Sequence, residues 1–317
     1  MSILVTGSAG FIGFHVSREL LEMGKKVIGV DSVTDYYEEQ LKWDRNSILE
    51  DYDKFCFYHE DITNTELLEK IFEKEKIDKI CHLAAQAGVR YSVENPQAYE
   101  KSNLKGFTNI LEMARHNNIE NLVYASSSSV YGGNEDVPYR VGDDVNRPVS
   151  YYAATKVANE VMAHSYSHLY DIPCTGLRFF TVYGPWGRPD MALFKFTDRI
   201  VEGEPIDVYN YGDMKRDFTY IDDIVDGVIT SLDKRFDYEI FNLGNNTPVE
   251  LMDFIEILED CIGMNAEKEM KPMQPGDVKV TYADISKSKE KLDFKPETNL
   301  EEGVERFIDW YKKYYNI

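Results

Sequence analysis

The sequence predicts an α/β protein with a parallel, doubly wound sheet and a smaller α/β domain toward the C-terminus. Three observations support this fold class: short apolar runs alternating with longer amphipathic stretches, a glycine-rich turn after the first run, and a change of rhythm after residue 178. Short apolar runs separated by helix-length segments are typical of buried parallel strands joined by crossover helices.

Six apolar runs within the first 180 residues have the length of buried strands. They lie at residues 3–5, 27–30, 55–58, 79–83, 122–125 and 174–178. Amphipathic stretches between them predict helices at residues 11–23, 66–75, 97–116 and 152–170. The order of these segments predicts a sheet with helices on both faces.

Glycine and proline punctuate the chain after residue 178, where short elements replace the earlier alternation. Two helices are predicted further on, at residues 251–262 and 300–314. Segments 222–232 and 240–243 are expected to return to the first domain. We therefore expect one domain of residues 1–180 with a return of 217–243, and a second of residues 181–216 and 244–317.

Composition excludes several classes of function. The chain carries 35 basic and 56 acidic residues, which give a formal net charge of −21. A general nucleic-acid-binding protein is therefore disfavoured, because binding the phosphates of a nucleic acid requires a basic face. No apolar run approaches the roughly 18 residues of a membrane span. The strand-like start leaves no room for a signal peptide, and the four cysteines are scattered, so we expect a cytoplasmic protein without disulfides.

Glycines at positions 7, 10 and 13 follow the first predicted strand and open the first helix. Glycine permits a tight turn and the close approach of a diphosphate, and the helix N-terminus attracts that anion. Asp31 ends the second strand, where an acid that binds ribose is expected. The alternative is a purely structural turn. The pattern indicates a Rossmann-type domain that binds NAD, because Asp31 would repel the 2′-phosphate of NADP.

Tyr152 and Lys156 stand at i and i+4, on one face of a predicted helix. A tyrosine acts as a base only when cations favour the phenolate, and a neighbouring ammonium and a nicotinamide cation both do so. Ser127 follows the fifth strand and could relay the proton. The alternative is a surface Tyr-Lys pair beside a serine-rich turn. Tyr211 and Lys215 share the spacing, but Gly212 interrupts it, so we interpret that match as coincidence.

Together these elements resemble the extended short-chain dehydrogenase/reductase family, and within it the NAD-dependent nucleotide-sugar epimerases and dehydratases. The resemblance covers essentially the whole chain. Its more specific segments, 86–92, 183–191 and 274–277, are most similar to UDP-glucuronate 4-epimerases. Many sugar-nucleotide epimerases carry Phe-Asn where this chain has Phe180-Thr181, a departure that fits a substrate with a carboxylate at C6.

The resemblance implies roles for further residues. Residues implied to bind the cofactor are Gly7, Gly10, Phe11, Ile12, Gly13, Asp31, Asp61, Ile62, Leu83, Ala84, Ala85, Tyr152 and Lys156. Residues implied to bind a UDP-sugar are Arg90, Ser127, Ser128, Thr181, Arg188, Arg216 and Asp277. Among these, Asp61 and Ile62 are expected beside the adenine, Arg216 at the UDP phosphates and Asp277 at the uridine ribose.

The resulting hypothesis is NAD-dependent C4 epimerisation of UDP-glucuronate to UDP-galacturonate, through a transient 4-keto sugar, with Tyr152, Lys156 and Ser127 as catalytic residues. Alternatives are UDP-glucose/UDP-galactose epimerisation, decarboxylation of UDP-glucuronate, and a catalytically silent NAD sensor. Related decarboxylases typically carry an acid where this chain has Ser129. The resemblance also implies a homodimer formed by the helices near 97–116 and 151–170.

A few residues have competing interpretations. His164 and His168 have metal-pair spacing but lack an evident third ligand, so no metal site is expected. Trp186 could line the pocket or cap a core. Arg188 could be a surface cation paired with Asp190.

Overall fold

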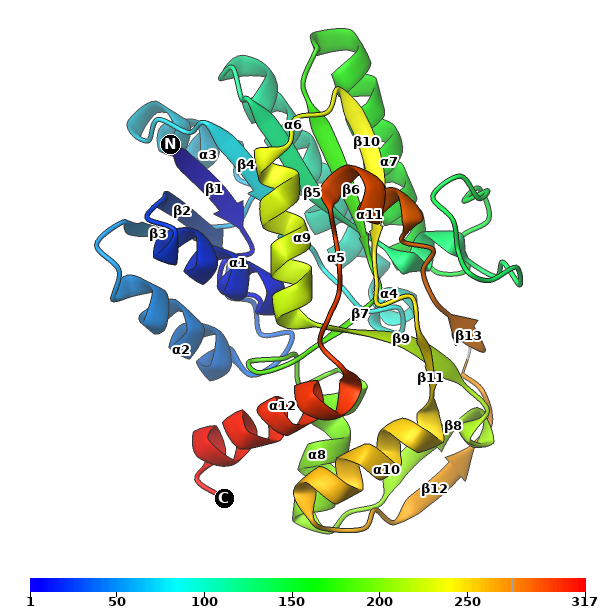
Figure 1. Ribbon diagram of the computed structural model, residues 1–317. Coiled ribbons are helices and arrows are strands. Elements are labelled where there is room, and N and C mark those ends of the chain that lie inside the picture. Colours follow the sequence, from blue (N-terminus) through cyan, green and yellow to red (C-terminus); the bar gives the residue numbers. More distant parts are fainter. Residues whose placement is uncertain (275) are drawn as a thin grey trace.

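The computed structural model describes residues 1–274 and 276–317, and its largest element is a parallel sheet of seven strands (Figure 1). In spatial order the strands are β10 (Tyr238–Leu243), β6 (Cys174–Phe179), β5 (Asn121–Ser127), β4 (Lys79–His82), β1 (Ser2–Thr6), β2 (Lys26–Asp31) and β3 (Phe55–His59). The predicted fold class is confirmed. The late strand β10 joins this sheet at its edge, in parallel pairing with β6.

Helices cover both faces of this sheet. One face carries α1 (Phe11–Glu22), α2 (Glu39–Glu50) and α9 (Ile221–Asp233), which are drawn in front in Figure 1. The other face carries α3 (Thr65–Lys74), α6 (Phe107–His116) and α7 (Tyr151–Tyr170). Each face buries its own apolar cluster, so the strands are covered on both sides, as parallel sheets require.

The strand order reverses at β1, which pairs with β2 on one side and β4 on the other. The loops that leave β1 and β4 therefore run in opposite directions and open a crevice at the carboxyl ends of the strands. Open α/β sheets bind their ligands at such a crevice.

One predicted helix is divided in the structure. Residues 97–116 were expected as a single helix, but they comprise the end of α5 (Pro96–Tyr99), a π-helical segment η1 (Glu100–Gly106) and α6. The short α4 (Tyr91–Glu94) precedes them. A π-helical stretch inside a helix is frequently found at a functional site.

The C-terminal part is built on two small sheets. A four-stranded sheet contains β7 (Thr181–Tyr183), β9 (Lys215–Tyr220), β11 (Pro248–Glu250) and β13 (Val280–Thr281). A two-stranded sheet pairs β8 (Ile206–Tyr209) with β12 (Lys268–Lys271). The helices of this part are α8 (Ala192–Glu202), α10 (Leu251–Ile262) and α12 (Leu300–Tyr315), and the 3₁₀ turn η3 (Asn210–Gly212) joins β8 to β9. Helix α11 (Ser286–Leu292) packs on β10 and α9 of the large sheet, and the 3₁₀ turn η2 (Ser128–Tyr131) follows β5.

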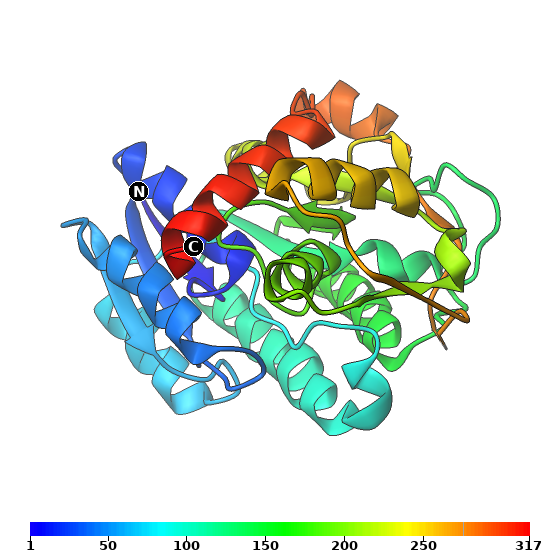
Figure 2. The same cartoon turned by 90° about the horizontal axis from the view of Figure 1, so that it is seen from below.

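The C-terminal helix α12 connects the two parts of the molecule. It lies beside α8 and α10 and points its C-terminal end toward α2 (Figure 2). The Tyr311 hydroxyl donates to Asp198 of α8 at 2.6 Å, whereas the Tyr314 hydroxyl donates to Asp44 of α2 at 2.5 Å. The same helix therefore contacts the large sheet's flanking helices and the C-terminal elements.

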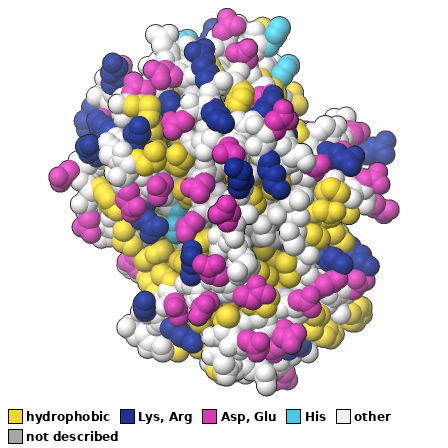
Figure 3. Space-filling view, in the orientation of Figure 1, with side chains coloured by type: hydrophobic (Ala, Val, Ile, Leu, Met, Phe, Trp, Pro, Cys, Tyr) yellow, Lys and Arg dark blue, Asp and Glu magenta, His cyan; other side chains and the backbone are white. Residues whose placement is uncertain are grey.

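The surface matches the composition. On the face drawn in Figure 3, acidic and basic side chains are interspersed. Among the described residues, no helix combines the length and the apolar character that crossing a bilayer requires. Within residues 1–274 and 276–317, no three His, Cys, Asp or Glu side chains lie close enough together to hold a metal ion.

Candidate active site

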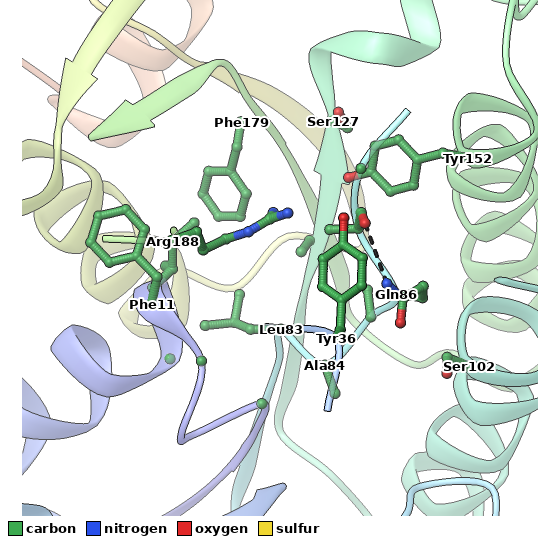
Figure 4. Close-up of a pocket in the computed structure, with 18 of the residues that line it drawn as sticks. Phe11, Tyr36, Leu83, Ala84, Gln86, Ser102, Ser127, Tyr152, Phe179 and Arg188 are labelled. Carbon is green, nitrogen blue, oxygen red and sulfur yellow. Dashed lines mark hydrogen bonds between the residues drawn. The ribbon is translucent and has the colours of Figure 1, made fainter. Parts of the chain in front are cut away.

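A cavity of about 400 Å³ lies in the crevice at the carboxyl ends of the strands. It contains most of the side chains that the sequence selected, and Figure 4 shows several of them. The selected residues that line it are Gly7, Gly10, Phe11, Ile12, Gly13, Asp31, Asp61, Ile62, Leu83, Ala84, Ala85, Ser127, Ser128, Tyr152, Lys156, Thr181 and Arg188.

The glycine loop between β1 and α1 leaves no room for side chains. A Cβ at Gly7 would stand 2.8 Å from the backbone nitrogen of Ala84, and Gly7 has a φ of +76°. A Cβ at Gly13 would stand 1.9 Å from the Gly7 carbonyl oxygen. The loop can therefore approach a ligand with bare backbone, which a diphosphate requires.

Helix α1 begins at this loop without a capping side chain. Its first N–H groups remain free to donate, and the positive end of its dipole points into the cavity. Asp31 lies at the end of β2, where its carboxylate accepts the backbone N–H of Ala9 at 3.0 Å and of Val33 at 2.8 Å. Burial raises the pKa of Asp31, and these two N–H groups oppose the rise. Together, the loop, the helix end and the acid fit a dinucleotide.

The candidate catalytic residues come from β5 and α7. The Lys156 ammonium donates to the Ala125 carbonyl oxygen at 2.9 Å, and burial lowers its pKa to about 8 while Glu160 opposes the shift. Burial raises the pKa of Tyr152, against a side-chain hydrogen bond from Ser127 and the charge of Arg188. The protein without ligand thus keeps Tyr152 protonated, and the phenolate needs a further cation beside it.

The π-helical segment joins the cavity wall to α7. Its Asn103 is 1% exposed, accepts the backbone N–H of Gln86 at 2.9 Å and donates to the Gln86 carbonyl oxygen at 3.0 Å. The same amide donates to the Thr155 hydroxyl at 3.0 Å. Asn103 therefore fixes the chain that leaves β4 relative to the helix that carries Tyr152 and Lys156.

Arg188 enters the cavity from the loop after β7, opposite Tyr152. Figure 4 shows its guanidinium and the Tyr152 hydroxyl pointing toward the middle of the pocket from opposite sides. Asp190 accepts from Arg188 Nε at 2.9 Å and from NH2 at 2.5 Å, and from the Tyr36 hydroxyl at 3.1 Å. Arg188 does pair with Asp190, as one interpretation expected, but it is not a surface cation, because its side chain is only 21% exposed and lines the cavity. The second edge of the guanidinium, formed by NH1 and NH2, remains open to an anion.

Three of the selected residues lie outside the cavity lining. Arg90 approaches Asp277 with 3.3 Å between NH2 and Oδ2, and Arg216 is close enough for Asp277 to favour its charge. Burial lowers the pKa of Arg216. Arg216 donates to the backbone carbonyl oxygens of Lys215 and Lys279. These residues form a second, partly cationic cluster; Pro275 of the same segment lies outside the described residues.

Several cavity residues were not predicted from the sequence, among them Tyr36, Lys42, Gln86, Phe179 and Met191. Tyr36 and Lys42 come from the loop after β2 and from α2, where no motif marks them. The competing pair does not share an α-helix, because Tyr211 lies in the 3₁₀ turn η3 and Lys215 begins β9, and Tyr211 is 66% exposed.

Comparisons with known proteins agree with this geometry. Residues 3–244 match the NAD dependent epimerase/dehydratase family. Protein CapI of Staphylococcus aureus is 51% identical, covering 99% of both chains, and a probable UDP-glucuronate 4-epimerase of Rhizobium meliloti is 45% identical, covering 99% of this chain and 98% of the relative. The crystal structure of UDP-glucuronic acid 4-epimerase from Bacillus cereus, in complex with UDP-glucuronic acid and NAD, is 36% identical and superimposes with a TM-score of 0.93, covering 99% of this chain and 100% of that one. This chain therefore belongs to the NAD-dependent epimerase/dehydratase family.

Proposed function

We propose that this protein is a UDP-glucuronate 4-epimerase, an NAD-dependent isomerase that interconverts UDP-glucuronate and UDP-galacturonate. One observation carries the proposal: a single cavity places an arginine opposite a Tyr-Lys-Ser set, beside a glycine loop that accepts a diphosphate. The similarity to relatives named UDP-glucuronate 4-epimerase, over nearly the whole chain, supports the same substrate.

The glycine loop and the first turn of α1 would hold the diphosphate of NAD, Asp31 its adenosine ribose, and Lys156 its nicotinamide ribose. When bound, NAD supplies an acceptor for the hydride of sugar C4 and later returns that hydride. Asp61 and Ile62 line the same end of the cavity as Asp31 and would flank the adenine. The remaining residues bind and orient the sugar and move its proton.

Tyr152 would take the proton of the sugar 4-hydroxyl, with Ser127 hydrogen-bonded to both oxygens during the transfer. Burial works against the phenolate, so the Lys156 ammonium and the positive charge of the oxidised cofactor must stabilise it when both ligands are present. Ser128 lines the cavity beside Ser127 and would contact the sugar.

Arg188 and Thr181 would bind the carboxylate at C6. Asp190 occupies the Nε edge of Arg188, so a substrate carboxylate would take the open edge formed by NH1 and NH2. The cationic cluster of Arg90 and Arg216, with Asp277, would bind the UDP part. In this arrangement the UDP part would stay anchored while the 4-keto sugar turns to present its other face.

We also propose the division into domains that the sequence indicates, residues 1–180 with a returning segment as the NAD-binding domain and the remainder as the nucleotide-sugar domain. The segment that returns to the large sheet comprises α9 and β10, residues 221–243. The expected return of 217–243 began too early, because residues 217–220 belong to β9 of the small four-stranded sheet.

A cytoplasmic homodimer remains our proposal for the assembled state. Helix α7 leaves Val161 64% exposed and Leu169 63% exposed, an apolar surface that a second copy could cover.

The Asp31→Ala variant is expected to bind NAD less tightly and to discriminate less against NADP. The carboxylate would no longer accept the ribose hydroxyls, and its charge would no longer repel a 2′-phosphate. Loss of hydrogen bonds to a charged group predicts a weakening of about 1.5–3 kcal/mol. Titrations with both dinucleotides measure the preference, and an unchanged preference would exclude Asp31 as the ribose ligand.

The experiment that tests the proposed function is a mass balance on UDP-glucuronate with the NAD-loaded protein. Oxidation at C4 makes a β-keto acid, which loses CO₂ unless its carboxylate is held away from the reactive geometry. Ser129 offers no acid–base group with a useful pKa near neutrality, so we expect reversible conversion to UDP-galacturonate with little CO₂.

A UDP-pentose as the main product would instead identify a decarboxylase. Faster turnover of UDP-glucose would favour the neutral-sugar epimerase, and bound NAD without turnover of any nucleotide sugar would favour the sensor.

A further inference from the structure

The turn Pro185-Trp186-Gly187 directly precedes Arg188, and buried side chains hold all three of its carbonyl oxygens. His15 Nε2 lies 2.9 Å from the Pro185 oxygen. Arg45 NH2 donates to the Trp186 oxygen at 2.6 Å and to the Gly187 oxygen at 3.0 Å. Side chains from two other helices, α1 and α2, therefore fix the backbone of this turn at three successive carbonyl groups.

The turn has a backbone conformation that must be held in place. Trp186 has a φ of +59°, in the left-handed region that a bulky residue rarely adopts, and Gly184 before it has a φ of +144°. Such conformations cost free energy and persist where the surroundings over-determine them. The Trp186 ring packs on Phe14 of α1 and on Trp310 and Tyr314 of α12, so the turn is held on its side-chain side as well. Of the two interpretations that the sequence left open for Trp186, the structure favours the cap: its partly buried ring packs against the core and anchors this turn.

Arg45 connects the turn to the glycine loop. Its side chain is fully buried on α2, and NH1 donates to the Ala9 carbonyl oxygen at 3.0 Å and to the Tyr37 hydroxyl at 2.8 Å. No carboxylate of the described residues forms an ion pair with Arg45. A buried cation without a contacting counter-ion is costly, so its hydrogen bonds to backbone carbonyls are the reason it is tolerated.

His15 acts as a neutral hydrogen-bond donor. Burial lowers its pKa to about 3, so the imidazole is uncharged at neutral pH. Because the Pro185 oxygen can only accept, the proton of the neutral ring lies on Nε2. The flanking residues of α1, Phe11 and Phe14, pack edge-on against the ring and keep it in place.

We infer that Arg45 and His15 are positioning residues that set the preference for a carboxylate-bearing sugar, by holding the 185–187 turn so that Arg188 points into the cavity. The inference rests on the proposed function, in which Arg188 binds the C6 carboxylate. Neither residue lines the cavity, so neither touches the substrate. Their effect on specificity reaches the substrate only through the backbone that precedes Arg188.

The test measures the ratio of affinities for UDP-glucuronate and UDP-glucose. Both dissociation constants are determined by calorimetry on NAD-loaded protein in a Tyr152→Phe background, where turnover does not interfere. Arg45→Lys and His15→Leu are expected to reduce the preference for UDP-glucuronate by about tenfold, since Arg188 would lose its fixed direction. The affinity for UDP-glucose should change by less than about threefold, because a neutral sugar does not use that charge.

Two matched variants separate positioning from general damage. His15→Gln keeps an N–H donor near the position of Nε2 and should restore most of the preference. Arg199→Lys changes an arginine of α8 that also donates to a backbone carbonyl, that of Pro205, away from the turn, and should leave the ratio unchanged. Loss of stability alone would lower the fraction of folded protein without altering the ratio.

The outcomes distinguish this inference from the proposed function. If the parent protein shows no preference for UDP-glucuronate, both are overturned. If the parent shows the preference and His15→Leu and Arg45→Lys retain it, only the inference is overturned. Should Arg45→Lys fail to fold, the comparison of His15→Leu with His15→Gln decides alone.

Discussion

Replacing Tyr152 with phenylalanine is expected to lower the turnover of UDP-glucuronate by at least about 10²-fold, the low end for general acid–base catalysis. The variant removes only the phenolic oxygen, so the ring keeps its edge-on contact with Tyr99 and α7 keeps its packing. NAD binding should be retained, because the glycine loop and Asp31 are untouched. The rate of appearance of UDP-galacturonate gives the measurement.

Tyr211→Phe is the matched control. This tyrosine has the same spacing to a lysine but is 66% exposed and lies outside the cavity, so its loss should leave the rate almost unchanged. Near-normal turnover by the Tyr152 variant would exclude it as the base. Equal losses in both variants would point to a nonspecific effect of removing tyrosine hydroxyls.

Arg188→Met is expected to raise KM or lower kcat for UDP-glucuronate. The resulting fall in kcat/KM should correspond to a loss of roughly 1.5–3 kcal/mol, the range for a hydrogen bond to a charged group. Methionine retains the apolar part of the side chain but cannot bind the C6 carboxylate. A neutral UDP-sugar should be affected less, because it lacks that carboxylate. Steady-state kinetics on UDP-glucuronate and UDP-glucose give the comparison.

The ion pair with Asp190 requires a second control. Removing Arg188 leaves a largely buried carboxylate without its cation, and that charge would itself repel the substrate carboxylate. The double variant Arg188→Met/Asp190→Asn removes both charges and isolates the lost hydrogen bonds. Equal losses on acidic and neutral substrates, in the single and the double variant, would assign Arg188 to nucleotide binding or to structure.

The sequence allowed the large sheet to be predicted because its strands are buried on both faces. Continuous apolar runs such as those of β1 and β2 have few other interpretations. Helix α2 was not predicted, although it packs against β3 of the sheet and against α1. Its buried side includes Lys42, Arg45 and Asn46, so hydrophobic periodicity gave no signal.

The parts of the site that could be predicted are those with a local sequence pattern. The glycine loop and the Tyr152–Lys156 spacing are local patterns whose chemistry can be inferred from a few consecutive residues. Contacts such as Arg45 to Gly187 join residues 142 positions apart, and no local pattern announces them. Helix α8 was missed for another reason: the prolines and glycines around residues 184–205 obscured an amphipathic stretch with a strongly apolar side.

The place of β10 in the sheet has a consequence for biosynthesis. This strand forms the outer edge beside β6, and α9, which immediately precedes it, covers the middle of the sheet near β4 and β5. During translation the first six strands emerge by residue 179. The part of the sheet that α9 covers nevertheless stays exposed until residue 233, and the outer side of β6 stays unpaired until residue 243. Some sixty residues of synthesis, several seconds at ribosomal speed, therefore separate an aggregation-prone intermediate from a closed domain. Ribosome-associated chaperones that shield apolar surface would have their greatest effect on the yield of this protein in that interval.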